Sequence, residues 1–143
     1  MKTVVWVMFI LASAVGCKPG YVKDLEQFAT QVKSGVNPDE LQSWATNLIS
    51  KTMSDPYRKE IIRNTFEVDR ADVPTYVRTI YKDDPPEWVL VDYGDIDRYV
   101  EVCYGSGFGH WGLFVGSPTL ELKSDRNCYI VKWKPGIYFW SGT

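Results

Sequence analysis

The fold of this chain is decided where its pattern changes, at residues 83–95, which read DDPPEWVLVDYGD. Two acidic residues followed by two prolines interrupt regular structure at 83–86. The run at 88–93 is rich in β-branched and aromatic residues, and Gly94-Asp95 is typical of a hairpin turn. This stretch therefore predicts the end of one kind of structure and the first strand of an antiparallel sheet.

The strand-like pattern continues from this stretch to the C-terminus. We expect strands at 88–93, 98–104, 111–116, 128–133 and 137–141. Pro135-Gly136 marks a further hairpin turn. The run at 129–140 is densely aromatic, and strand alternation places Tyr129, Val131 and Trp133 on one face. We interpret these side chains as core, and a sugar- or peptide-binding face is the alternative.

The residues before position 83 have helical spacing instead. Apolar residues recur three and four positions apart from Val22 to Val32, and Gly35 is placed to end that helix. Asn37-Pro38 predicts the N-cap and first turn of a second helix. We expect a third helix after Asp55-Pro56 and a short helical turn after Pro74. Helices first and strands afterwards predict an α+β domain, with N-terminal helices packed on a C-terminal antiparallel sheet of about five strands.

The first 16 residues have the organisation of a signal peptide. Lys2 precedes a twelve-residue apolar run at 4–15. As a helix this run would span about 18 Å, short of the roughly 30 Å hydrocarbon core of a bilayer. It ends in AVGC, residues 14–17, which resembles the lipobox of bacterial lipoproteins, whose cysteine becomes the acylated first residue. The resemblance implies that Cys17 carries a palmitate-type lipid. Cleavage after Ala14, which would release a secreted protein, is the alternative.

This signal sets the expected organisation of the rest of the chain. Residues 1–16 are the signal peptide, 17–20 a tether, and 21–143 a single α+β domain, which suits the length of 143 residues. The expected location is the cell envelope, held to a membrane by the lipid and facing the extracytoplasmic side.

The cysteine count favours lipidation. The chain has three cysteines, Cys17, Cys103 and Cys128. Ordinary cleavage would leave an odd number in an oxidising compartment, whereas lipidation uses one and leaves a pair. Cys103 and Cys128 then form either a disulfide or two separately buried thiols.

The charge pattern argues against one class of partner. The chain carries 16 Lys and Arg against 18 Asp and Glu, without a run of five or more basic residues. Phosphate backbones are bound by clustered positive charge, so we expect no nucleic acid. The expected partners are the membrane, through lipidated Cys17, and an envelope protein or glycan.

The stretch YGSGFGHWG, residues 104–112, is the strongest site candidate. Its glycines relax the backbone, and the single histidine of the chain follows them. We interpret the loop as the rim of a binding surface; the alternative is a glycine-rich bulge with a structural histidine. The residues of this surface are Gly105, Gly107, Phe108, Gly109, His110 and Trp111.

The strand HWGLFVG, residues 110–116, resembles the histidine-bearing strand of NlpC-type cell-wall peptidases. In that family the histidine activates a cysteine nucleophile, so the resemblance implies that His110 is a base. The family places its cysteine at the start of an upstream helix, where this sequence has none, and Cys103 falls in a predicted strand. The nucleophile–base pair therefore cannot form in the family's way. Catalytic candidates are limited to His110, Cys103 and Ser106.

Other polar clusters suggest little chemistry. Aspartates around the turn at 92–97 do not fit a calcium loop, and acidic residues flanking the double proline are explained by a polar loop. These carboxylates are Asp92, Asp95 and Asp97 in the first group and Asp83, Asp84 and Glu87 in the second. One histidine and two cysteines without CxxC or HExxH spacing predict no metal, and no cofactor motif is present.

Together these observations predict a membrane-anchored extracytoplasmic lipoprotein module. We expect it to bind a protein or envelope component without catalysis. The alternative is an envelope-directed hydrolase of cysteine or serine type that uses His110 as its base.

Overall fold

The strands of this protein form one antiparallel sheet, in a computed structural model that describes residues 20–56, 60–62, 64–81, 85–94, 97–105 and 109–142. Within these residues the sheet has seven strands in the order β1-β2-β3-β4-β5-β7-β6. Their bounds are β1 (Glu60–Ile62), β2 (Thr65–Glu67), β3 (Trp88–Tyr93), β4 (Arg98–Tyr104), β5 (His110–Gly116), β6 (Cys128–Lys134) and β7 (Ile137–Gly142). The five predicted strands are thus confirmed, and two short ones precede them.

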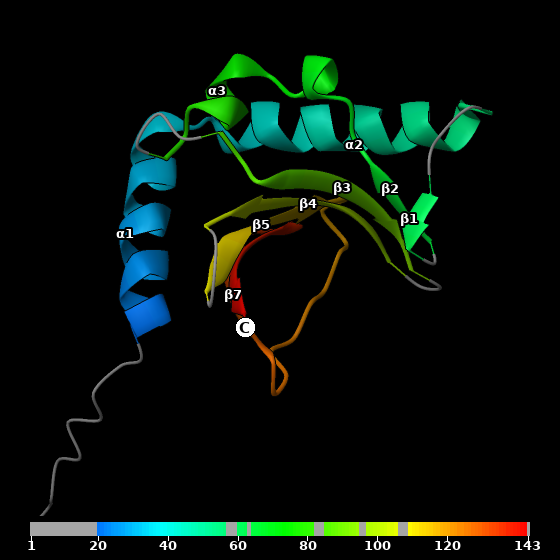
Figure 1. Ribbon diagram of the computed structural model, residues 1–143. Coiled ribbons are helices and arrows are strands. Elements are labelled where there is room, and N and C mark those ends of the chain that lie inside the picture. The colour runs from blue at the N-terminus through cyan, green and yellow to red at the C-terminus, as the bar shows by residue number, and fades with distance from the viewer. Residues whose placement is uncertain are drawn as a thin grey trace, which may run out of the picture.

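The helices all precede β3 and cover one face of the sheet, which confirms the predicted α+β arrangement (Figure 1). They are α1 (Gly20–Gly35), α2 (Pro38–Ser54), the 3-10 turn η1 (Arg70–Asp72) and α3 (Thr75–Arg78). Asn37 caps α2 as predicted, because its side-chain oxygen accepts from the backbone N–H groups of Asp39 and Glu40. Among the described residues, no helix has both the length and the apolar character needed to cross a bilayer.

One sequence prediction was wrong at the end of α2. The segment after Asp55-Pro56 was expected to be helical, but β1 and β2 follow instead and pair as a hairpin. Asn64 sits in the left-handed region, with φ of 60°, where the short polar side chain of Asn is tolerated. This turn reverses the chain, and β2 then pairs antiparallel with β3, with Phe66 opposite Val91.

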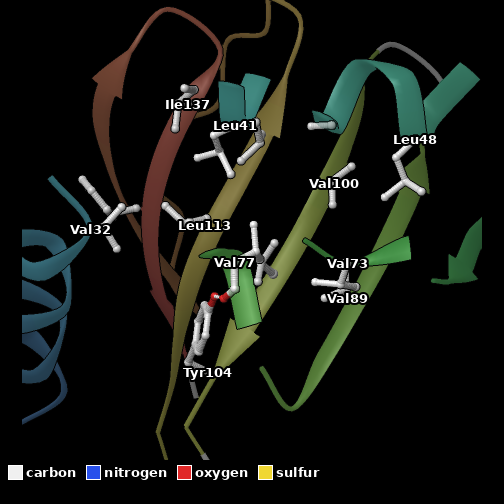
Figure 2. Packing of buried hydrophobic residues seen from close by; sticks show 14 of the residues in the cluster. Val32, Leu41, Leu48, Val73, Val77, Val89, Val100, Tyr104, Leu113 and Ile137 are labelled. Atoms are coloured by element: carbon white, nitrogen blue, oxygen red, sulfur yellow. Dashed lines mark hydrogen bonds between the residues drawn. The ribbon is translucent and has the colours of Figure 1, made fainter. Parts of the chain in front are cut away.

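The main core lies between the helices and the sheet (Figure 2). Leu41 and Leu48 of α2 pack on Val100 of β4 and Leu113 of β5, all within one buried cluster. The opposite face of the sheet is covered by the segment at 117–127, which Figure 1 shows crossing beneath the strands. Leu120 of that segment is buried in a second cluster. The sheet therefore has two covered faces, and the face away from the helices carries the candidate site.

Two side chains, the buried Tyr104 and the partly buried Gln42, connect the helical layer to the sheet by hydrogen bonds. The hydroxyl of Tyr104 donates to the carbonyl oxygen of Val77 in α3, and Figure 2 shows these two residues facing each other. Gln42 of α2 donates through Nε2 to the carbonyl oxygens of Gly116 and Pro135, both at 2.9 Å. These three bonds join side chains and backbone carbonyls of the helical layer and the sheet, so they help to fix how the helices sit on the sheet.

The edge strand β6 is partly capped by the preceding segment. The hydroxyl of Ser124 accepts from the N–H of Ile130 (2.8 Å) and donates to its carbonyl (3.2 Å). The carboxylate of Asp125 accepts from the N–H of Cys128 at 2.9 Å. Open edges invite pairing with other chains, and these bonds occupy part of that edge.

Candidate functional site

Three donor side chains from separate segments meet on the face of the sheet away from the helices. The Sγ atom of Cys103 lies 3.7 Å from Nδ1 of His110, and the same nitrogen lies 3.5 Å from Oε2 of Glu87. One donor atom from each residue lies within 4.8 Å of the other two. The structure therefore brings together two catalytic candidates and one of the acidic loop residues.

Strand pairing explains why these residues meet. Cys103 of β4 stands opposite Trp88 of β3 on one side and Gly112 of β5 on the other. His110 lies two residues before Gly112 and so projects from the same face. The N–H of Glu87 donates to the carbonyl of Cys103 at 2.8 Å, which places Glu87 beside the thiol. Gly112 lets the neighbouring strand approach closely, since a Cβ atom there would meet the backbone carbonyl oxygen of Val102 at 1.9 Å.

Trp88 packs against the ring of His110, and Glu101 in turn accepts a hydrogen bond from Trp88. The Trp88 and His110 rings lie 5.0 Å apart between centroids, at an interplanar angle of 51°. The Nε1–H group of Trp88 donates to Oε1 of Glu101 at 3.1 Å. Burial raises the pKa of the Glu101 carboxyl, although the bond from Trp88 acts in the opposite direction. The His110 ring is thus packed against a Trp88 side chain that is itself held by a hydrogen bond.

The thiol of Cys103 is poorly suited to act as a nucleophile. The residue is completely buried, and its Sγ donates to the carbonyl oxygen of Tyr104 at 3.7 Å. Burial raises the pKa of Cys103 far above its usual value, and the carboxylates of Glu101 and Glu87 raise it further. A thiolate is the reactive form, so this environment keeps the sulfur protonated and inert.

The structure places two residues of the predicted loop surface, Trp111 and His110, on opposite faces of the sheet. Trp111 packs edge-on against Tyr81, with ring centroids 5.9 Å apart, on the helix-covered face. Its ring lies against Gly105, which has φ of +92°, and a Cβ atom there would come within 2.6 Å of it. His110 projects from the opposite face. Ser106, Gly107 and Phe108 lie outside the described residues.

The two cysteines do not form a disulfide in the structure. Cys103 is a buried free thiol and Cys128 a half-buried one. They lie on β4 and β6, which are separated in the sheet by β5 and β7. Of the two alternatives that the sequence left open, the structure has separate thiols. Cys17 lies outside the described residues.

Of the three β6 residues predicted to be core, Tyr129, Val131 and Trp133, only Trp133 packs against the core. Trp133 is half-buried and stacks on Phe139 with centroids 5.4 Å apart. Tyr129 and Val131 are 47% and 37% exposed, so the prediction that they are core was wrong. β6 is the edge strand, and its face is less completely covered than that of β7, which is buried from Ile137 to Trp140.

The remaining carboxylates show no shared site in the described part of the chain. Asp92 accepts from the hydroxyl of Tyr99 at 3.1 Å, which explains it as a structural acceptor. Asp83, Asp84 and Asp95 lie outside the described residues. Only Glu87 of these groups joins the donor cluster.

A groove of about 580 Å³ opens beside the cluster, between α2, η1 and the start of β3. Glu87 and Trp88 belong to its lining, so the groove and the cluster share a wall. Its floor is polar and carries both signs of charge, including the Lys51–Asp72 ion pair at 2.7 Å. No spacing in the sequence indicated this groove, because its walls come from segments far apart in the chain.

Comparison with known proteins adds no relative. No protein-family model, curated protein or solved structure matches this chain.

Proposed function

We propose that the protein is a membrane-anchored extracytoplasmic lipoprotein module that binds a protein or envelope component without catalysis. The observation that carries the non-catalytic part is the burial of Cys103, which keeps the candidate nucleophile protonated and out of reach of a substrate. The anchoring part comes from the apolar run at 4–15 and the lipobox-like AVGC at 14–17.

The binding surface that we propose is centred on the shared wall of Glu87 and Trp88. Both side chains contact His110, and both residues belong to the lining of the groove beside α2. A groove whose lining carries charges of both signs suits a polar partner, such as a peptide segment or a glycan. His110 lies at the margin of this surface with 26% of its side chain exposed.

The second candidate function is an envelope-directed hydrolase. One observation favours it, namely the 3.7 Å separation between the Cys103 sulfur and a His110 ring nitrogen. Ser106 also belongs to this alternative and lies outside the described residues. A conformational change that exposed the thiol would be required before Cys103 could react.

One experiment separates the two functions. Purified wild-type protein and the His110→Ala variant are incubated with isolated cell-wall material, and soluble fragments are quantified over time. We expect neither protein to exceed the buffer blank. Release by wild type that disappears in His110→Ala, but persists in Cys128→Ser, would establish the hydrolase instead.

The anchor is tested separately by the mass of the mature N-terminus. We expect a diacylglyceryl-modified Cys17 as the first residue, and a Cys17→Ala variant that is not acylated. An unmodified N-terminus at Val15, or an intact Met1, would exclude lipidation.

A further inference from the structure

We propose that Glu87, Cys103 and His110 form a zinc-binding site. A Cys sulfur, a His nitrogen and a Glu oxygen are the three ligand types that proteins use for Zn²⁺. Here one donor atom of each type lies within 4.8 Å of the other two. The sequence predicted no metal, because the three residues come from three segments and no spacing motif joins them.

Two of the distances between donor atoms are close to those expected around a tetrahedral zinc ion, and both are slightly longer. Zinc bonds of ordinary length to sulfur and nitrogen place those two atoms about 3.6 Å apart, and bonds to nitrogen and oxygen place them about 3.4 Å apart. The observed separations are 3.7 Å for Cys103 Sγ to His110 Nδ1 and 3.5 Å for His110 Nδ1 to Glu87 Oε2. The third pair, the Cys103 sulfur and a Glu87 carboxylate oxygen, lies within 4.8 Å, and rotation of the partly exposed Glu87 side chain would bring that oxygen to the ion.

The hydrogen bonds around Nδ1 of His110 are also compatible with a bound cation. Nδ1 of His110 faces both a thiol and a carboxylate, but this nitrogen can carry only one proton. On binding, Zn²⁺ would take the place of the Cys103 thiol proton, which leaves to solvent, and neutral His110 would ligate through Nδ1. Glu101 is a further acidic side chain beside the site, because it accepts a hydrogen bond from Trp88, the residue that packs on His110.

The surroundings resemble the outer shell of a metal site. Metal-binding rings are usually held by further contacts, and here Trp88 packs on His110 and is itself held by Glu101. Cys103 is buried, whereas the side chains of His110 and Glu87 are 26% and 43% exposed. The ion would thus bind the buried Cys103 sulfur on its inner side. One coordination position would stay open toward solvent, for water or a donor atom of the partner.

The test uses cobalt as a spectroscopic substitute for zinc, with the full chain purified in detergent. Co²⁺ bound to a thiolate absorbs in the near ultraviolet through sulfur-to-metal charge transfer. We expect one equivalent of Co²⁺ to produce this band, and Zn²⁺ to displace it. Cys103→Ser should abolish the band, and the matched control Cys128→Ser should retain it. A band that depends on Cys128 or survives in Cys103→Ser would overturn the proposal, as would the absence of any band.

Variants of the two partly exposed ligands, Glu87 and His110, test the site without changing the buried Cys103. Glu87→Gln and His110→Asn should preserve the circular dichroism spectrum of wild type. We expect each to weaken Zn²⁺ binding at least about tenfold in competition with a chromogenic chelator, since loss of even an outer-shell partner costs this much. Unchanged affinity in both variants would refute the site. This outcome is distinct from failure of the proposed anchoring, which is measured at Cys17.

Discussion

The sulfur of Cys103 lies 3.7 Å from Nδ1 of His110, yet the thiol is completely buried and donates to the carbonyl of Tyr104. A cysteine nucleophile needs the thiolate form and an approach route for substrate. Proximity to a histidine supplies neither here. The relationship is better suited to a ligand pair than to a nucleophile and its base.

Thiol reactivity distinguishes these roles directly. Burial, followed by the charge of Asp125, raises the pKa of Cys128 to about 11. Below that value its thiolate fraction, and hence its alkylation rate, should rise about tenfold per pH unit, while Cys103 stays unmodified in the folded protein. Peptide mass spectrometry after timed iodoacetamide treatment measures both sites. In urea both should react, and native labelling of Cys103 as fast as Cys128 would contradict its burial.

The hydroxyl of Tyr104 should contribute measurably to stability. Its bond to the Val77 carbonyl is buried, so Tyr104→Phe leaves that oxygen without its partner. We expect a loss of about 1–3 kcal/mol in the free energy of unfolding, measured by urea titration. Tyr129→Phe, at an exposed position of β6, is the control and should change little. Equal effects of the two changes would argue against the buried bond.

Gly112 should be intolerant of any side chain. A Cβ atom there would meet the carbonyl oxygen of Val102 at 1.9 Å, whereas at Gly35 it would meet nothing within 4 Å. We expect Gly112→Ala to destabilise the protein by about 1–3 kcal/mol or more through overpacking. Gly35→Ala should be neutral or stabilise it by up to about 1 kcal/mol. Thermal unfolding of both variants tests the difference, and similar midpoints would contradict the close strand approach.

The N-cap of α2 should be worth a typical capping energy. Asn37 accepts from two backbone N–H groups that have no partner within the helix. Asn37→Ala should therefore cost about 0.5–2 kcal/mol in urea unfolding. Thr30→Ala, on the exposed side of α1, provides the reference and should stay within about 0.5 kcal/mol of wild type. A cost no larger than that of the reference would show that the cap is dispensable.

Glu101 should make stability depend on pH. Burial raises its pKa above the ordinary 4.5, so the folded state binds this proton more tightly than the unfolded chain does. Stability contributed by protonated Glu101 is therefore present at low pH and is lost as pH rises through the raised value. Glu101→Gln, which can still accept from Trp88, should raise the melting temperature at neutral pH, and the gain should shrink at acidic pH.

Glu121 is a control for this prediction, because its pKa is shifted in the opposite direction to that of Glu101. Its bond from Lys132 lowers the pKa of the Glu121 carboxyl, so its contribution is present at neutral pH and lost in acid. Glu121→Gln should not raise the melting temperature at neutral pH. If both substitutions shifted the melting temperature in the same direction, burial of Glu101 would not be the cause.

Local sequence signals predicted most of the fold because they act over short distances. The β-branched and aromatic residues at 88–93 and the Asn37 cap need only neighbouring residues, and the strand and the cap that they predicted were both confirmed. The hairpin of β1 and β2 was missed because its strands are short and are stabilised by pairing with β3, more than twenty residues further along. The exposure of Tyr129 was missed because alternation does not reveal which strand lies at an edge.

By itself, the sequence determined the first two helices, the five strands from 88 onward, the Asn37 cap and the signal-like N-terminal segment, because periodicity and backbone preferences are local. It also identified His110 and Cys103 as chemically interesting without placing them. Only the tertiary structure decided that they meet, that Glu87 joins them, and that the thiol is buried. The pairing of β3 with β4 and of β4 with β5 sets these contacts. Burial follows from how the layers pack, and that packing is a property of the whole chain.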